Sequence, residues 1–136
     1  MTKAAKTTSG RDTILVIDDD RDLRSLIATI GEINGIRVLE AADCSIGLKI
    51  LDKEHERIKL VLLDYFMPGM EPTTCAKAIV AKAGKAIAVF LLTAADDPAG
   101  RAAQLNVNGW LPKPTEVANI TKLFSTVAFP QKETGK

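Results

Sequence analysis

The sequence predicts an α/β fold, a doubly wound five-stranded parallel sheet with helices on both faces. Three observations lead to this prediction. Short apolar runs alternate with helical patterns along the whole chain. Two of the runs, residues 13–17 and 60–63, contain no charged side chain, which is typical of strands buried on both faces. The length of 136 residues fits one domain, and no repeat or low-complexity linker divides the chain.

The first half of the chain opens with a strand at residues 13–17. Asp20 precedes a helical pattern with one apolar face, formed by Leu23, Leu26, Ile27, Ile30 and Ile33. Gly35 ends this helix, and residues 37–40 are expected as a short second strand. Asp43 is a suitable cap for a second helix, whose apolar face carries Ile46, Ile50 and Leu51.

The second half continues the alternation. Residues 60–63 form the third strand, and the next helix, which follows Pro68, Gly69 and Pro72, has the apolar face Ala76, Ile79, Val80 and Ala83. Residues 86–92 are the longest strand candidate. Asp97 caps a helix with Pro98 in its first turn and an end near Leu105. Residues 109–111 are a short fifth strand candidate, and a last helix from Thr115 carries Val117, Ile120, Leu123, Phe124 and Val127.

Each helix must return the chain to the same end of the sheet, so the strands are expected to be parallel. Right-handed crossovers leave few arrangements, and five units favour the flavodoxin-like (βα)5 fold with strand order 2-1-3-4-5. A nucleotide-binding order is the competitor, but aspartates occupy the first strand-to-helix turn, where a glycine-rich phosphate loop would lie. We expect a flexible tail at residues 1–12, the domain at 13–129 and a second tail at 130–136.

Composition excludes several functions. The formal net charge is +1, from 18 Lys and Arg against 17 Asp and Glu, so no overall field predicts a nucleic-acid or membrane partner. Residues 1–11 lack the apolar centre of a signal peptide, and no apolar segment approaches the ~20 residues of a membrane span. We expect a soluble cytoplasmic protein.

Cys44 and Cys75 lie in helical stretches without metal-ligand spacing, so two buried or half-buried thiols are expected. His55, among charged neighbours, is expected at a solvated loop or helix end.

Polar residues follow four of the expected strands. Asp18 and Asp19 follow the first, Asp64 the third, Thr93 the fourth, and Lys113 comes just past the fifth. Ligands of such sheets bind outside the carboxyl ends of the strands, where the strand order reverses. The first and third strands are neighbours in the order 2-1-3-4-5. We therefore expect three carboxylates in one pocket, flanked by the threonine and the lysine.

Three carboxylates at such short range repel one another, by about 4 kcal/mol for each pair at ~4 Å and an effective dielectric near 20. Proton uptake with a raised pKa, a nearby cation or a bound metal can offset this repulsion. Ligands that are all oxygen favour a hard cation, Mg²⁺ or Mn²⁺. Because Mg²⁺ often combines one or two carboxylates with a phosphate, the cluster favours phosphoryl chemistry.

Four segments carry a resemblance to a known family. Residues 14–20 (ILVIDDD), 62–68 (LLDYFMP), 92–94 (LTA) and 111–114 (LPKP) resemble the signature segments of receiver domains of two-component response regulators. Their order and spacing match as well, and the resemblance runs from Thr13 to Val127. Within this family, the chain is similar to a single-domain chemotaxis regulator.

The resemblance implies a role for each site residue. Asp64 would be the phosphoacceptor, which takes a phosphoryl group from a phosphohistidine. Asp19 and Asp64 would bind Mg²⁺ directly, together with the backbone carbonyl of Phe66, and Asp18 would act mostly through water. Three further roles complete the set: Lys113 pairs with a phosphoryl oxygen, Thr93 donates a hydrogen bond to another and moves toward it, and Trp110 follows Thr93 as a switch. A cis Lys113–Pro114 bond is also implied.

The implied function is a phosphorylation-dependent signalling receiver that catalyses only its own phosphorylation and dephosphorylation. Its partners would be a sensor histidine kinase or histidine phosphotransfer protein and a downstream protein target. Arg21, Arg24 and Ser25 on the first helix are candidates for the kinase contact, and the fourth helix and fifth strand for the output. Whether the chain stands alone, shuttles phosphate or belongs to a larger protein stays open.

Two alternative functions fit the sequence less well. A Mg²⁺-dependent phosphatase or phosphotransferase with an aspartate nucleophile would favour a second aspartate two positions after Asp64, where this chain has Phe66. A degenerate receiver is disfavoured because the five key polar residues are present. Phe66 and Ala95 also occupy positions that often carry polar side chains able to orient water. Neither can do so, which predicts a phosphoryl group that persists beyond minutes.

Overall fold

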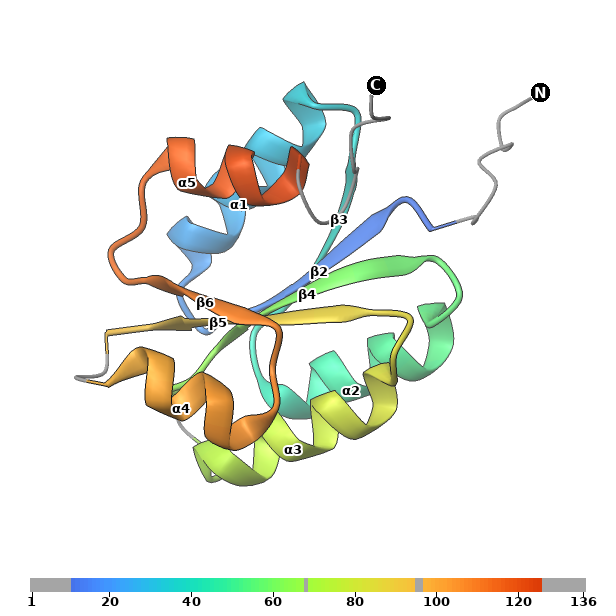
Figure 1. Cartoon of the computed structure of the whole chain (residues 1–136). Helices are drawn as coiled ribbons and strands as arrows, with labels where there is room; N and C mark the ends of the chain where they lie inside the picture. The colour runs from blue at the N-terminus through green and yellow to red at the C-terminus, as the bar shows by residue number, and fades with distance from the viewer. Residues whose placement is uncertain (1–10, 68, 95–96, 126–136) are drawn as a thin grey trace, which may run out of the picture.

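Five parallel strands form the sheet of the computed structural model, which describes residues 11–67, 69–94 and 97–125. The strand order is β3-β2-β4-β5-β6, which confirms the predicted order 2-1-3-4-5 (Figure 1). The strands are β2 (Thr13–Ile17), β3 (Arg37–Ala41), β4 (Ile58–Asp64), β5 (Ala88–Thr93) and β6 (Gly109–Pro112). The order reverses between β2 and β4, so the carboxyl ends of these two strands lie side by side.

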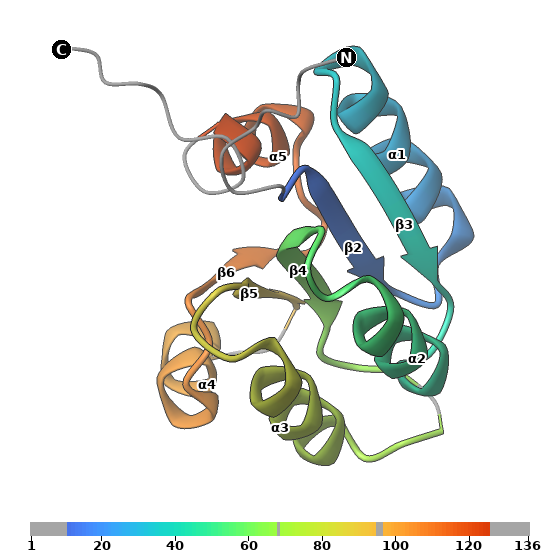
Figure 2. The ribbon, with the colours of Figure 1, turned by 90° about the vertical axis from the view of Figure 1, so that its right-hand side faces the viewer.

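Helices cover both faces of the sheet (Figures 1 and 2). One face carries α1 (Arg21–Ile33) and α5 (Val117–Leu123), and the other carries α2 (Cys44–Glu54), α3 (Pro72–Ala83) and α4 (Pro98–Leu105). Across residues 11–67, 69–94 and 97–125, none of the helices has both the length and the apolar character needed to cross a bilayer.

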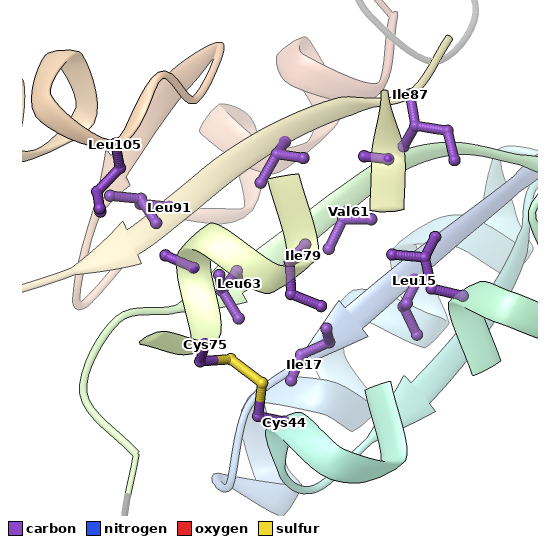
Figure 3. Close-up of a cluster of buried hydrophobic side chains, with 14 of the residues drawn as sticks. Leu15, Ile17, Cys44, Val61, Leu63, Cys75, Ile79, Ile87, Leu91 and Leu105 are labelled. Atoms are coloured by element: carbon purple, nitrogen blue, oxygen red, sulfur yellow. A yellow bond between two sulfur atoms is a disulfide. The ribbon is translucent and has the colours of Figure 1, made fainter. Parts of the chain in front are cut away.

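The middle of each central strand is apolar because both faces of the strand are buried there. Side chains alternate along a strand, so Leu15 and Ile17 pack under α2 and α3, whereas Ile14 and Val16 pack under α1 and α5. All four are fully buried. Figure 3 shows the first of these clusters, with the side chains of β2, β4 and β5 meeting those of α3. The two cores hold the strand ends in fixed positions.

Three predicted helix starts, those capped by aspartate, agree with the structure, whereas α5 begins at Val117, two residues after the predicted start at Thr115. The side chain of Asp20 accepts hydrogen bonds from the backbone N–H groups of Asp22 and Leu23, which caps α1. Asp43 caps α2 and Asp97 caps α4 in the same way. Gly35 has a φ of 73° just after α1, in the left-handed region that glycine adopts at little cost.

Several boundaries differ from the predicted ones. β4 begins at Ile58, two residues early, because Ile58 pairs with Thr13 of β2. β5 begins at Ala88 rather than residue 86, since Ala88 is the first residue that pairs with β4. His55 is at the end of α2 as expected, but it is half-buried and its Nε2 lies 3.3 Å from the carbonyl oxygen of Ala83. Val127 lies outside the described residues, and of the expected tail Arg11 and Asp12 are described, with Arg11 donating to the His55 carbonyl.

The expectation of two free thiols is wrong. Cys44 and Cys75 form a disulfide, with their Cα atoms 6.1 Å apart (Figure 3). Their predicted burial is confirmed, at 4% and 3% exposed. The sequence separation of 31 gives no local signal for the pairing. It arises because α2 and α3 pack side by side on one face of the sheet, which places their first turns in contact.

Gly47 marks the close approach of α2 to the sheet. A Cβ atom there would lie 2.5 Å from Cδ1 and 2.8 Å from Cγ1 of the fully buried Ile17. We predict that Gly47→Ala lowers the free energy of unfolding by up to about 2 kcal/mol, the ~1–3 kcal/mol cost of overpacking less the ~1 kcal/mol that alanine adds in a helix. Urea denaturation tests this, with the exposed Ser45→Ala as the matched control. A Gly47→Ala protein more stable than the parent would contradict it.

Candidate functional site

The strand ends bring the predicted polar residues to one edge of the sheet. Asp18 follows β2, Asp64 ends β4 and Thr93 ends β5. Asp18, Asp64 and Thr93 are buried, at 0%, 4% and 2% exposed, whereas Asp19 is exposed. Lys113 follows β6, and its backbone N–H donates to the carbonyl oxygen of Thr93. The edge of the sheet therefore holds buried acids beside a threonine and a lysine.

The three aspartates come close enough to share a cation. One carboxylate oxygen from each of Asp18, Asp19 and Asp64 lies within 4.8 Å of the other two. Two of these side chains are buried and the third is open to solvent. An all-oxygen set that is open on one side suits a hard divalent ion that keeps some of its water. The residues present therefore fit a Mg²⁺ or Mn²⁺ ion.

Lys113 neutralises part of the acidic charge. Its Nζ donates to Oδ2 of Asp18 at 3.1 Å and lies 3.4 Å from Oδ2 of Asp64. The lysine side chain is 24% exposed, so the ammonium group is largely shielded from water. The Lys113–Pro114 bond is cis, as the resemblance implied. A nearby cation is thus one of the means by which the structure offsets the repulsion among the carboxylates.

Asp18 is held on three sides. Its Oδ1 accepts a hydrogen bond from the backbone N–H of Asp20 at 2.8 Å, and its Oδ2 accepts from Lys113. Its backbone carbonyl accepts from Nη1 of Arg24 at 2.8 Å, and Arg24 is also paired with Glu40. Arg24, an expected kinase-facing residue, therefore also fixes the turn that carries Asp18. The contacts to the two Asp18 oxygens, at 2.8 and 3.1 Å, are shorter than the corresponding contacts to Asp64, at 3.3 Å from the Phe66 N–H and 3.4 Å from Lys113.

Asp64 has an unusual proton affinity. Burial and, second, the charge of Asp18 raise the pKa of Asp64 from its ordinary 3.8 to about 7, although Lys113 and the backbone N–H of Phe66 act to lower it. Burial alone would lower the pKa of Lys113, but the hydrogen bond and charge of Asp18, with the charge of Asp64, raise it. Without a metal, the site therefore combines proton uptake with a lysine cation.

An aromatic pair and an arginine lie next to Asp64. The rings of Tyr65 and Phe66 pack edge to face, with centroids 4.8 Å apart. The guanidinium of Arg101, from α4, lies over both rings at 5.1 and 5.8 Å, and its Nη1 donates to the Tyr65 hydroxyl. Phe66 is still 51% exposed. These contacts of Arg101 could not be predicted from the sequence, because the two rings are 36 and 35 positions away, in the segment after β4.

The predicted switch residue Trp110 lies on the edge strand of the sheet, whereas the main chain of Phe66 lies at the site. Trp110 is 37% exposed on β6, the edge strand, next to Leu91 of β5 in the register. Ala95 lies outside the described residues. The backbone N–H of Phe66 donates to Oδ1 of Asp64 at 3.3 Å, so the Phe66 main chain is at the site. The site therefore unites a buried carboxylate, a cation and further carboxylate oxygens, which can support attack by Asp64 on an anionic electrophile.

Sequence comparison points to one family. The family model described as response regulator receiver domain matches residues 14–125. The CpxR homolog of Haemophilus influenzae, a transcriptional regulatory protein, is 35% identical over 123 residues, which cover 86% of this chain and 52% of that protein. The putative two-component response regulator ARR21 of Arabidopsis thaliana is 25% identical, over 90% of this chain and 20% of that protein. This chain thus spans about half the length of these relatives or less.

Solved structures give the same result for the fold. A response regulator receiver domain protein of Clostridium thermocellum has a TM-score of 0.71 and 28% identity, over 81% of this chain and 88% of that chain. The chemotaxis protein CheY4 of Vibrio cholerae has a TM-score of 0.74 and 23% identity, over 86% of this chain and 98% of that chain. The second likeness concerns the fold alone.

Proposed function

Because the chain belongs to the response regulator receiver domain family, we propose that it accepts a phosphoryl group on Asp64 and controls a partner through the resulting change in shape. The observation that carries the proposal is the surroundings of Asp64. Asp64 is 4% exposed, and its carboxylate lies 3.4 Å from the Lys113 ammonium. One of its oxygens is within 4.8 Å of a carboxylate oxygen of Asp18 and one of Asp19, close enough for the three to share a cation.

We propose Mg²⁺ as the resident cation, with Mn²⁺ as a substitute. Asp19 and Asp64 would hold it directly with the backbone carbonyl of Phe66, and Asp18 would act mostly through water. The shorter hydrogen bonds to the two Asp18 oxygens, at 2.8 and 3.1 Å against 3.3 and 3.4 Å for the contacts of Asp64, support the indirect role of Asp18. When bound, the ion neutralises negative charge between the carboxylates and an incoming phosphoryl group.

The chemical step is a phosphoryl transfer from a phosphohistidine. An oxygen of the Asp64 carboxylate attacks phosphorus, an O–P bond forms, and the P–N bond to the histidine breaks with its electron pair left on the imidazole. Lys113 would pair with a phosphoryl oxygen, which relieves the charge that Asp64 gains. The step requires ionised Asp64, so the raised pKa of Asp64 implies that loss of its proton accompanies metal binding.

The output follows from contacts made after transfer. Thr93, at the end of β5, would donate its hydroxyl hydrogen to a phosphoryl oxygen, and Trp110 on the neighbouring β6 would change its side-chain position in response. A histidine kinase or phosphotransfer protein would be the donor, and a downstream protein the target. We propose that the reaction takes place in the cytoplasm, where ATP supplies the phosphoryl group of such a phosphohistidine. We propose that the chain catalyses only its own phosphorylation and dephosphorylation.

The geometry does not favour the small-molecule phosphatase. Such an enzyme needs a general acid two positions after the nucleophile, and here Phe66 lies against Tyr65 and Arg101 instead. A phenyl ring has no proton to give to a leaving group.

The proposal is tested by intact mass after incubation with acetyl phosphate. We expect one phosphoryl group per chain when Mg²⁺ is present and none when EDTA replaces it. An unchanged mass, also with a phosphorylated histidine kinase as donor, would reject the proposal. Multiple adducts that do not require the metal would mean nonspecific acylation.

Phe66 gives a prediction about the lifetime of the phosphoryl group. We predict that the phosphorylated protein hydrolyses with a lifetime beyond minutes, because a phenyl ring cannot orient an attacking water. Phe66→Asn should shorten the lifetime by about tenfold, less than the ~10²–10⁴-fold of a full general acid–base group, because an amide only orients the water and takes no proton from it. Phe66→Leu is the matched control and should stay slow. Mass spectra recorded over time after removal of the donor measure both; rapid hydrolysis in the parent that Phe66→Asn does not accelerate would contradict the idea.

A further inference from the structure

The disulfide joins the first turns of two helices that begin at the same edge of the sheet as the candidate site. Cys44 is the first residue of α2, and Cys75 is in the first turns of α3. Both helices begin at the carboxyl edge of the sheet (Figure 3), the edge at which Asp18 follows β2 and Asp64 ends β4. The bond closes a loop with a sequence separation of 31, and this loop contains Asp64.

Both ends of the disulfide connect to the strands that carry the carboxylates. On one side, α2 packs through Gly47 against Ile17, the residue before Asp18. On the other side, α3 continues from the segment that starts at Tyr65, directly after Asp64. Ile17, Cys44, Tyr65 and Cys75 belong to one buried cluster. A covalent tie between the helices therefore restrains the two turns that hold the acidic oxygens.

We propose that Cys44 and Cys75 are a reversible redox modification site, whose oxidised form tightens the cation site and whose reduced form loosens it. The effect on the cation and the reducing surroundings rest on the proposed function, whereas the thiol–disulfide exchange itself can be measured without it. A phosphotransfer module that works in the cytoplasm meets a reducing thiol pool, where disulfides that form are usually transient or redox-sensing. The co-substrate is then a low-molecular-weight disulfide for oxidation and a low-molecular-weight thiol for reduction.

The exchange balances without any other reactant. In oxidation, one cysteine thiolate attacks the small disulfide, forms a mixed disulfide and releases one small thiol. The second cysteine thiolate then displaces the other small thiol and closes the protein disulfide. The two protons of the cysteine thiols end on the two small thiols. Two electrons pass from the protein to the small disulfide, and reduction is the reverse.

Burial sets the rate of this exchange. At 4% and 3% exposed, neither residue can be reached in line by an external thiolate unless a helix start opens locally. We expect reduction of the native protein to be slow and reduction in denaturant to be fast. The site would thus report sustained changes in the thiol pool.

We expect the disulfide to affect the affinity for Mg²⁺ through the turn after Asp64. The Phe66 backbone N–H donates to the Asp64 carboxylate, so restraint of this turn holds Asp64 ready for an ion. We expect the oxidised protein to bind Mg²⁺ about threefold to tenfold more tightly than the reduced one, somewhat less than the 10–100-fold typical of lost supporting contacts to ligands.

The test follows thiols and Mg²⁺ affinity on the same samples. Free cysteines are tagged with maleimide in denaturant, and the tags on each chain are counted by mass. The protein isolated under air should carry no tag. After treatment of the native protein with dithiothreitol it should carry two, and after subsequent treatment with oxidised glutathione it should again carry none. Calorimetry should then give the threefold to tenfold difference between the two states. The Cys44→Ser/Cys75→Ser protein should match the reduced form and ignore both reagents.

Three other outcomes would each reject one part of the proposal. Tags that never appear after prolonged reduction of the native protein, or never disappear with oxidised glutathione, overturn the reversible site. Equal Mg²⁺ affinity in the two states, with binding present in both, overturns the inference alone. Absence of Mg²⁺ binding in both states rejects the proposed function and the effect that rests on it, while the tag counts still decide the thiol chemistry.

Discussion

Replacing Asp64 with asparagine should raise the free energy of unfolding at pH 8, without divalent ions, by on the order of 3 kcal/mol. The reason is the cost of ionising a buried carboxyl beside Asp18, which raises the pKa of Asp64 to about 7 in the folded protein. In the unfolded chain its pKa is near the ordinary 3.8. Asparagine keeps the shape of the side chain and removes the charge.

The sign follows from proton counts. Between about pH 4 and pH 7 the folded state binds a proton at Asp64 that the unfolded state has released. Proton uptake by the folded state means that the stability contributed by this group falls as the pH rises through that window. The stability gained by Asp64→Asn should therefore be small near pH 4 and full near pH 8.

Urea denaturation from pH 4 to pH 8 in EDTA measures this difference. Asp52→Asn is the matched control, because the Asp52 side chain is 61% exposed and its ion pair with Lys82 is superficial. Such pairs contribute about 0–1 kcal/mol. A constant difference between the parent and Asp64→Asn across the pH range would contradict the raised pKa.

Lys113→Met should have the opposite effect on stability. It leaves the fully buried Asp18 without the ammonium group 3.1 Å away. Loss of one member of a buried ion pair typically costs about 3–5 kcal/mol, and proton uptake by Asp64 reduces this toward about 2–3 kcal/mol at pH 7. We also expect the rate of phosphorylation by acetyl phosphate to fall about 100-fold, as when one donor to a developing charge is removed.

Two measurements separate these effects. Urea denaturation at pH 7 gives the loss of stability, and the initial rate of the mass increase gives the loss of phosphoryl transfer. Lys82→Met, which breaks the exposed pair with Asp52, should change neither by much. A Lys113→Met protein as stable and as reactive as the parent would show that the lysine neither stabilises the carboxylates nor assists transfer.

The sequence predicted most of the fold because its signals are local. Strand β2 is apolar without interruption, and α1 combines a capping Asp20 with an apolar face, so each element could be identified from neighbouring residues alone. Boundaries were less certain. The start of β4 depends on the pairing of Ile58 with Thr13, a contact across the sheet that no periodicity contains.

The candidate site was predictable for a topological reason. Once the strand order is known, Asp18, Asp64 and Thr93 must meet, because each is at the carboxyl end of a neighbouring strand. The features that escaped prediction are contacts between side chains of separate helices and loops. The disulfide of Cys44 with Cys75 is one, and the position of Arg101 over Tyr65 is another. Both depend on how helices pack on the sheet.

The most direct test of the central claim is to identify the residue that carries the phosphoryl group. The protein is incubated with acetyl phosphate and Mg²⁺, the acyl phosphate is trapped with borohydride, which converts the modified aspartate to homoserine, and the peptides are analysed by mass. We predict homoserine at position 64 in the parent and no adduct in Asp64→Asn. An adduct at another aspartate, or an undiminished adduct in Asp64→Asn, would contradict the assignment of Asp64 as the phosphoacceptor.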